Sequence, residues 1–269
     1  MKAPGTTTVV DVAKAGARHT LMRLMAFLAL FGALQACHGN PEARLPAPDP
    51  AQEAPSHAQW DSLLQAHVSA DGLVDYAGFL QDRHRLQAYL DHLSGYIPGQ
   101  HWSREETLAY YINLYNAGTV ALILEHYPVG SIKDIRSPWG KRRLKLGDAT
   151  LSLDDVEHGI LRKMGEPRIH FALNCASFSC PKLRPEAYFA DRLEAQLEAA
   201  ARDFINDPLR NRAAGGRPEL SRIFKWYGAD FTQGGGTLTG FLNRYLKTPL
   251  PEGTTLRYLP YDWSLNDIR

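Results

Sequence analysis

Apolar residues spaced three and four positions apart predict most of the regular structure of this chain. The strongest such segment is 103–127, which opens with the capping-box pattern Ser103-x-x-Glu106 and ends before Pro128. Because this segment is apolar on most faces, we expect it to be a central, buried helix. Further helices are predicted at 58–68, 79–96, 153–163, 186–206 and 238–245.

Strand signals are fewer and shorter than helix signals. A hairpin is predicted over 141–152, with its turn at 147–148, and an apolar run predicts a buried strand over 168–174. Two more short strands are predicted at 220–223 and 256–259. The whole pattern predicts an α+β fold in which the central helix packs on a small antiparallel sheet.

The first part of the chain carries export signals. Positive residues precede an apolar run over 24–34 that is too short to span a bilayer, so residues 1–36 are predicted to be a signal peptide. The end of this run, Leu34-Gln-Ala-Cys37, resembles a bacterial lipoprotein signal. That resemblance implies lipidation at Cys37 and a periplasmic location, at the outer membrane because His38 follows. A simple secretory signal is the alternative.

The rest of the chain divides into a tether and a domain. Residues 37–56 are rich in proline and lack an apolar period, which predicts an extended tether that carries the lipidated cysteine. Residues 57–269 are predicted to form a single globular domain. A formal net charge of +1 gives no overall attraction for nucleic acid, and the phosphate-binding glycine motifs are missing from the sequence. We therefore expect neither a nucleic-acid partner nor a nucleotide cofactor.

Reactive side chains are concentrated between residues 151 and 181. They are Glu157, His158, Arg162, His170, Cys175 and Cys180. On an α-helix Arg162 shares a face with His158, whereas Glu157 does not; Glu157 also fits a helix-capping role. Asn116, in the apolar central helix, is a further candidate because a buried amide needs hydrogen-bond partners, and packing is its alternative role.

Four separated motifs resemble those of one family. They are Tyr115-Asn-Ala117, Leu151-Ser-Leu153 with Val156-Glu-His-Gly-Ile-Leu-Arg162, Phe171-Ala-Leu-Asn-Cys-Ala-Ser-Phe-Ser-Cys-Pro181, and Tyr261-Asp-Trp-Ser-Leu-Asn266. Across residues 57–266 the chain is similar to the "domain of unknown function 547" family, found in exported bacterial proteins and in plants. The resemblance implies a papain-like or transglutaminase-like thiol hydrolase, with Glu157, His158 and Cys175 at the matching positions.

The first interpretation of these residues is a cysteine hydrolase that cleaves amide or peptide-like bonds. Cys175 would be the nucleophile, with His158 as the base and His170 as the competing base. Glu157 or Asn116 would orient the imidazole, and backbone N–H groups in the turn after the cysteine would form an oxyanion hole.

Two other interpretations remain open. In one, the protein is a non-catalytic binding or scaffold module, and Cys175 forms a disulfide with Cys180 in an oxidising periplasm. In the other, both cysteines bind a metal together with His158 and His170, although their spacing matches no usual zinc pattern. The three interpretations differ in what they predict: a free thiol of low pKa for the hydrolase, a disulfide for the binding module, and a metal retained on purification for the metal site.

Overall fold

The computed structural model describes residues 46–213 and 217–268. The predicted signal peptide and Cys37 lie outside the described residues. Glu42–Arg269 forms one compact unit, and its described part combines many helices with two small two-stranded sheets. The α+β class predicted from the sequence is therefore confirmed. Within the described residues, no helix is both long enough and apolar enough to span a membrane.

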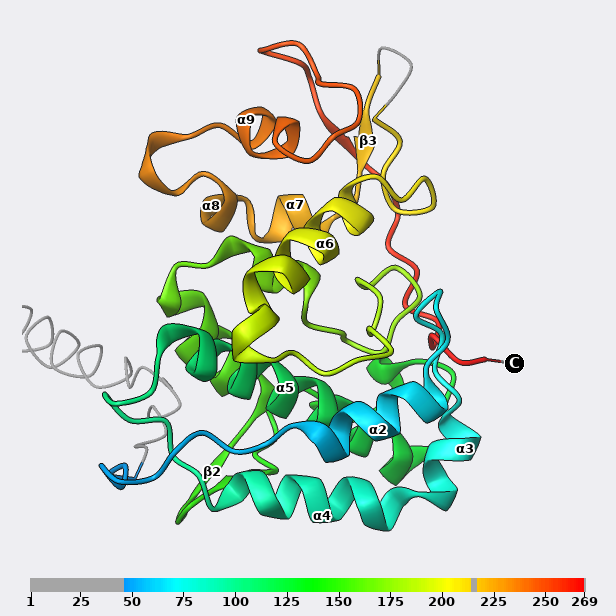
Figure 1. Cartoon of the computed structure of the whole chain (residues 1–269). Helices are drawn as coiled ribbons and strands as arrows, with labels where there is room; N and C mark the ends of the chain where they lie inside the picture. The colour runs from blue at the N-terminus through cyan, green and yellow to red at the C-terminus, as the bar shows by residue number, and fades with distance from the viewer. Residues whose placement is uncertain (1–45, 214–216, 269) are drawn as a thin grey trace, which may run out of the picture. The chain divides into compact units, whose positions relative to one another are not determined.

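Helix α5 (Arg104–His126) forms the centre of the first hydrophobic core (Figure 1). Its predicted capping box is present: Ser103 N–H donates to Glu106 Oε2 at 2.7 Å, and Glu106 N–H donates to Ser103 Oγ at 3.1 Å. Most of its side chains are buried, as predicted. Gly118 permits the close approach of Leu144, because a Cβ there would collide with one methyl group of the leucine, Cδ2.

Three helices pack with α5 in the lower part of Figure 1. They are α2 (Ala58–His67), α3 (Tyr76–Gln81) and α4 (Arg83–Ser94). The sequence predicted one helix over 79–96, but the structure divides this region at Asp82. The Asp82 carboxylate lies 2.8 Å from a ring nitrogen of His67 on α2, so the break ties two helices together.

The sheets are only partly as predicted. Strands β1 (Leu144–Leu146) and β2 (Ala149–Leu151) form the predicted antiparallel hairpin. Strands β3 (Glu219–Leu220) and β4 (Arg257–Tyr258), however, pair in parallel. The predicted small antiparallel sheet is therefore present as the hairpin, whereas the parallel pair was not predicted, because two residues on each strand carry too little alternation to specify a partner or a direction.

A second hydrophobic core is built around a cluster of phenylalanine rings (upper part of Figure 1). It lies among α6 (Leu193–Ile205), α7 (Ile223–Trp226), α8 (Gly228–Phe231) and α9 (Leu238–Asn243). Phe171 is its central ring, with four other phenylalanine centroids 5.3–6.2 Å away. Phe171 therefore joins the segment of the predicted site to the C-terminal helices.

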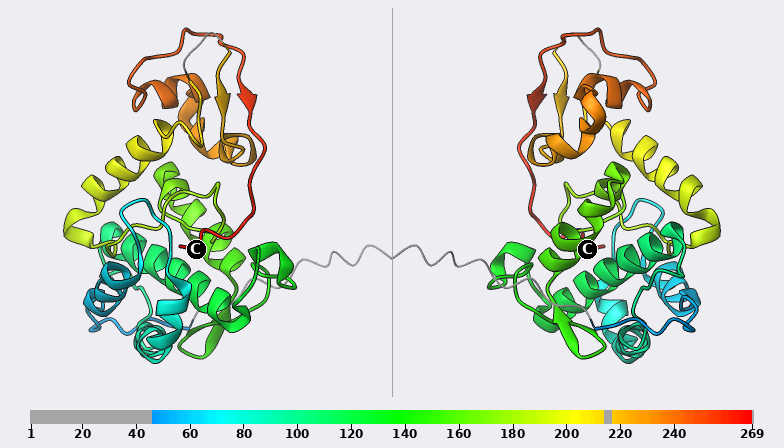
Figure 2. Two further views of the ribbon diagram at one scale, coloured as in Figure 1. Left: turned by 90° about the vertical axis from the view of Figure 1, so that its right-hand side faces the viewer. Right: turned by 90° about the vertical axis from the view of Figure 1, so that its left-hand side faces the viewer.

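The C-terminal segment returns from β4 to the first core (Figure 2). Leu265 N–H donates to Gly130 O at 2.9 Å, and Asn266 N–H donates to Ala176 O at 3.3 Å. The second of these bonds fixes the end of the chain against the turn that follows Cys175. Tyr261 is consequently held beside that turn.

The predicted helix at 153–163 is not a regular α-helix. Its main part is a π-helix, η2 (Asp155–Ile160), followed by the 3-10 helix η3 (Leu161–Met164). Ser152 and Asp155 cap this segment reciprocally, with bonds of 2.9 and 3.0 Å between backbone N–H groups and side-chain oxygens. π-Helical turns are frequent at functional sites because they redirect side chains.

The predicted strand at 168–174 is wrong: the structure has a 3-10 helix there, η4 (Pro167–Phe171). Proline at its first position presets a helical φ, and the Glu166 side chain accepts the N–H of Arg168 at 3.1 Å. A short apolar run fits a strand and a buried helical turn equally well, so periodicity misled the prediction. Other 3-10 turns are η1 (Ile132–Asp134), η5 (Ala190–Arg192) and η6 (Gln233–Gly235).

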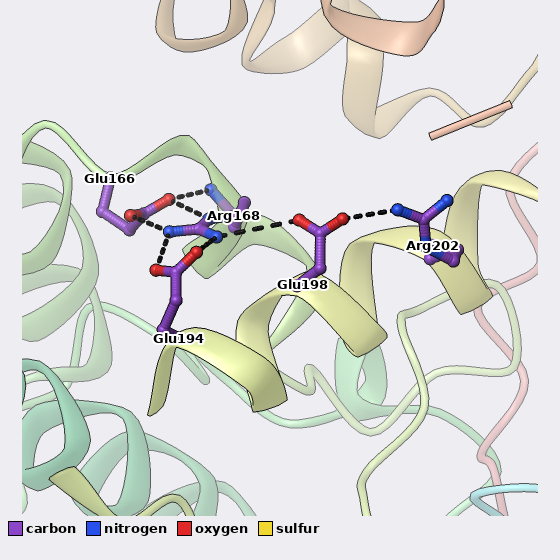
Figure 3. A network of polar contacts seen from close by, with 5 residues as sticks. All are labelled: Glu166, Arg168, Glu194, Glu198 and Arg202. Atoms are coloured by element: carbon purple, nitrogen blue, oxygen red, sulfur yellow. Dashed lines mark hydrogen bonds and ion pairs between the residues drawn. The ribbon is translucent and has the colours of Figure 1, made fainter. Parts of the chain in front are cut away.

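A network of charged side chains connects η4 to α6 (Figure 3). The Arg168 guanidinium contacts both oxygens of Glu166 at 2.8 Å and both oxygens of Glu194 at 2.7 and 2.8 Å. Glu198 lies 3.9 Å from the same guanidinium and 2.6 Å from Arg202. Such paired, planar contacts position a side chain well. The network holds the backbone two residues before His170.

His57, at the start of α2, gives the fold a pH dependence. Burial lowers the pKa of His57 from 6.5 to about 4, with a further contribution from His92, and its ring lies 2.7 Å from Tyr89 Oη. His57 stays neutral in the folded state, so its stabilising contribution is complete above pH 6.5 and is lost as the pH falls toward 4. Between pH 7 and pH 4, the free energy of unfolding measured with urea should fall by about 3 kcal/mol more for the wild type than for His57→Gln. An equal loss in both proteins would contradict this prediction.

Candidate active site

A cavity of about 290 Å³ brings most of the candidate residues together. Glu157, His158, His170, Cys175 and Cys180 all line it. The other lining residues are Tyr115, Trp139, Asp154, Leu173, Pro181, Ile223, Trp226, Tyr227, Tyr261 and Trp263. The cavity thus combines the polar segment around residue 157, the cysteine turn and aromatic residues from the last part of the chain.

The backbone just after Cys175 is strained. Ala176 has a φ of +58°, a left-handed conformation that residues with a side chain seldom adopt. Its N–H donates to Asn174 Oδ1 at 2.9 Å, and Asn174 also donates to Pro181 O at 2.8 Å. Strain of this kind persists where surrounding bonds enforce it, and it is concentrated at functional sites. The turn therefore presents the Cys175 thiol at one fixed place in the cavity wall.

The thiol of Cys175 is partly exposed and surrounded by hydroxyl groups. Its sulfur lies 3.1 Å from Ser177 Oγ and 3.4 Å from Tyr261 Oη, and these two oxygens are 3.2 Å apart. Burial favours the neutral thiol, but hydrogen bonds from Cys180, Ser177 and Tyr261 outweigh burial and lower the pKa of Cys175. Burial raises the pKa of Tyr261, so its phenol remains a donor.

The Tyr261 hydroxyl should therefore control the reactivity of Cys175. In Tyr261→Phe the sulfur loses one donor to its thiolate form, so the pKa of Cys175 should rise. Alkylation by iodoacetamide is measured across pH 5–9 and located by peptide mapping. The pH at which the alkylation rate of Cys175 rises should be higher in the variant. Tyr258→Phe is the control, because Tyr258 is not among the residues that line the cavity. An unchanged profile in Tyr261→Phe would show that its hydroxyl does not stabilise the thiolate.

Cys180 is buried and chemically different from Cys175. Both cysteines are free, so the disulfide of the alternative interpretation is not formed in this structure. The sulfur of Cys180 instead accepts the backbone N–H of Cys175 at 2.8 Å. Burial, followed by its neighbour's thiolate, raises the pKa of Cys180 well above its usual range. The turn thus holds one thiol that ionises easily and one that stays protonated.

His170 is buried and oriented by a carboxylate that sequence analysis did not identify. Its Nε2 lies 2.7 Å from Asp230 Oδ2, and its ring stacks on Tyr227 with 3.9 Å between centroids. Arg162 holds Asp230 with two bonds, at 2.6 and 2.9 Å. Burial lowers the pKa of His170 despite its bond to Asp230, and the bonds from Arg162 lower the pKa of Asp230. A neutral imidazole held by a carboxylate is the arrangement of a general base.

Glu157 and His158 both reach the cavity, although an α-helix would have separated them. The π-helix changes the direction of successive side chains, and His158 remains 44% exposed with its Nδ1 3.9 Å from Glu157 Oε1. Glu157 is buried, takes no part in the helix cap, and hydrogen-bonds to Tyr227. The predicted proximity of His158 and Arg162 is confirmed, with 3.4 Å between Nδ1 and Nη1.

Asn116 does not line the cavity. Its Nδ2 donates to Ala172 O at 2.9 Å, and its Oδ1 accepts the N–H of Asn174 at 2.9 Å. The amide thus satisfies the backbone of the non-helical segment that leads to Cys175. Asn116 therefore has the packing role, which was the alternative left open by the sequence.

The turn after Cys175 does not offer the backbone oxyanion hole that we expected. The Ser177 N–H is directed to the Cys175 sulfur. The remaining N–H groups donate to acceptors of the protein: Ala176 to Asn174, Phe178 to Ser264, Ser179 to Asp262 and Cys180 to Ser177. Besides the Ser177 N–H, the hydroxyls of Ser177 and Tyr261 contact the sulfur, at 3.1 and 3.4 Å.

A metal site receives no support from the described residues. Among residues 46–213 and 217–268, no three His, Cys, Asp or Glu side chains are grouped so that they could hold a metal ion. His170 is already bonded to Asp230, and the two sulfurs are bonded within the turn. This arrangement weighs against the zinc interpretation.

Three site residues were not predicted from the sequence: Asp230, Tyr227 and Tyr261. Asp230 lies between Ala229 and Phe231 in an apolar stretch, where a carboxylate is unusual, and this was the available signal. Tyr261 belongs to a quoted family motif, but 86 positions separate it from Cys175. Only tertiary structure connects them.

Comparison with known proteins supports the resemblance noted in the sequence. Residues 99–205 match the model of the family "Protein of unknown function, DUF547". This stretch contains α5, the π-helix, His170 and both cysteines of the cavity, whereas Asp230 and Tyr261 lie outside it. No match was found among curated proteins or among solved structures. The family description gives no activity, so the cavity is the only basis for the functional proposal below.

Proposed function

We propose that this protein is an exported cysteine hydrolase that cleaves amide or peptide-like bonds. One observation carries the proposal: a free thiol of lowered pKa, Cys175, lines the same cavity as His170, a neutral imidazole bonded to Asp230. Nucleophilic thiols require a lowered pKa, and their bases require a third group that fixes the imidazole. The papain-like or transglutaminase-like resemblance agrees with this chemistry.

Each step of the reaction has a residue to perform it. His170 takes the proton of Cys175, the sulfur attacks the carbonyl carbon, and the oxyanion that forms is met by the Tyr261 hydroxyl. The C–N bond then breaks, and the departing amine takes the proton from His170. Water attacks the resulting thioester, gives a proton to His170, and displaces the Cys175 thiolate as the acid leaves.

We assign the base to His170 rather than to His158, the base that the sequence predicts. His170 is buried and held by Asp230, whereas His158 is 44% exposed and lies 3.8–3.9 Å from its nearest carboxylates. In the described part of the chain the Cys175 sulfur makes no hydrogen bond with either histidine. Such contacts often tighten only when substrate is bound.

We place the enzyme in the periplasm, anchored to the outer membrane by lipid at Cys37. Gln52 O accepts the indole N–H of Trp102 at 2.8 Å and Ala54 packs on the first core, so the predicted tether would be the part of the chain between Cys37 and Gln52. That part would let the domain reach substrates away from the membrane surface. Membrane extraction and mass spectrometry of the mature N-terminus test this placement. A mature chain without a lipidated Cys37 would refute it.

The test of the hydrolase is thiol labelling joined to a substrate screen. Without reductant, the full-length protein should alkylate at Cys175 well below pH 8, and a panel of fluorogenic aminoacyl amides should then reveal turnover that iodoacetamide abolishes. Labelling only after reduction, with Cys175 and Cys180 in one bridged peptide, would refute the proposal.

The second candidate function is a non-catalytic binding module. It is favoured by one observation, namely that the backbone N–H groups of the turn after Cys175 are already bonded within the protein. A thiol that labels rapidly, combined with no turnover across the panel and saturable ligand binding, would support this candidate.

A further inference from the structure

The cavity beside Cys175 has an aromatic wall made of Trp139, Trp226, Tyr261 and Trp263. The rings are interlocked, with centroids 4.5 Å apart for Tyr261 and Trp263, 4.8 Å for Trp226 and Tyr261, and 5.8 Å for Trp139 and Trp263. Trp226 is 45% exposed, which is unusual for so large an apolar side chain. Indole faces attract cations through their negative quadrupole.

The wall already holds one alkylammonium group of the protein. Lys133 Nζ lies 5.1 Å from the ring centroid of Trp263. Lys133 is not among the residues that line the cavity. The same cluster can therefore receive a second ammonium group on its cavity side.

The charges that line the cavity have one sign. They belong to Asp154 and Glu157, and among the described lining residues there is neither lysine nor arginine. Arg162, the cation near Glu157, is committed to Asp230 by two bonds. Partial burial raises the pKa of Asp154, and its acidic neighbours add to the rise against the opposing effect of His158. A bound cation would reduce the excess of negative charge in the cavity, and a bound anion would increase it.

We propose that this cavity selects substrates that carry a protonated alkylamine close to the amide to be cleaved. The ammonium group would lie against the Asp154 carboxylate, on the side away from His158, with its methylene chain against Trp139, Trp226 and Trp263. At about 290 Å³, the cavity is at the small end for ligand sites, which fits one lysine-like side chain rather than an extended ligand. This inference rests on the proposed hydrolase for its substrate, but its binding step does not require turnover.

Binding to the full-length Cys175→Ala protein tests the site without hydrolysis. By calorimetry, N-acetyl-lysine methylamide should bind at least about tenfold more tightly than N-acetyl-norleucine methylamide, which lacks only the amine, while the glutamate analogue should bind most weakly. Asp154→Asn should remove most of the lysine preference. Asp191→Asn, which deletes an exposed carboxylate elsewhere, should leave it unchanged.

The outcomes separate this inference from the proposed function. Equal or tighter binding of the norleucine compound, an unchanged preference in Asp154→Asn, or no binding of any probe would overturn the ammonium site. Selective binding by Cys175→Ala, with no turnover of lysine amides by the wild type, would overturn the hydrolase and retain the site. Turnover of amides without preference for an amine would overturn the ammonium site and retain the hydrolase.

Discussion

Cys175→Ala should lose hydrolysis of every amide substrate that the wild type cleaves, with kcat/KM falling by a factor on the order of 10⁴ to 10⁶. The reason is that the covalent route requires a sulfur at this position, and the hydroxyls of Ser177 and Tyr261 can bind an oxyanion but cannot replace the nucleophile. Turnover of the best substrate from the screen, together with trapping of a thioester by hydroxylamine in the wild type, is the measurement.

The matched control is Cys180→Ser. Cys180 is buried, has a raised pKa and serves as an acceptor for the N–H of Cys175, and a serine hydroxyl keeps an acceptor there. This variant should retain most of the activity. If Cys180→Ser lost as much activity as Cys175→Ala while both variants kept the wild-type unfolding midpoint, the assignment of a single nucleophile would be wrong.

Elements with strong local signals were predictable from the sequence. The central helix has its capping box at Ser103 and Glu106, and the hairpin has a turn glycine, Gly147, with a φ of +54°. Each of these features is decided within a few residues. The π-helix at Asp155–Ile160 has no comparable signal, because its hydrogen-bond pattern follows from the packing around it rather than from residue spacing.

The site was predictable to the extent that its residues are close in sequence. Cys175, His158 and Glu157 lie on neighbouring segments of one stretch, and all three line the cavity. The partner of His170 was not predictable, because Asp230 is 60 positions away and the strand expected at 168–174 suggested a different direction for the imidazole. The spacing of apolar residues along the sequence indicates which residues belong to one helix or strand. Tertiary packing decides which helices and strands come into contact.

The role of His170 gives the second large prediction. His170→Ala should lower kcat/KM by about 10² to 10⁴, because the proton of Cys175 and that of the leaving amine lose their carrier. His158→Ala should cost less than about tenfold, since an exposed ring without a close carboxylate contributes little to proton transfer. The pH–rate profile of the wild type should stay high below pH 6.5, because burial lowers the pKa of His170.

Asp230→Asn provides the control for this assignment. An amide can still bond His170, but it no longer favours the imidazole tautomer that accepts a proton, so activity should fall while binding of an inert substrate analogue is retained. His170→Ala leaves Asp230 paired with Arg162, so the loss of activity should not come from unfolding. If His158→Ala were the more damaging substitution, the base would be the exposed histidine. Asp230 would then serve only to attach η3, through Arg162, and η4, through His170, to α8.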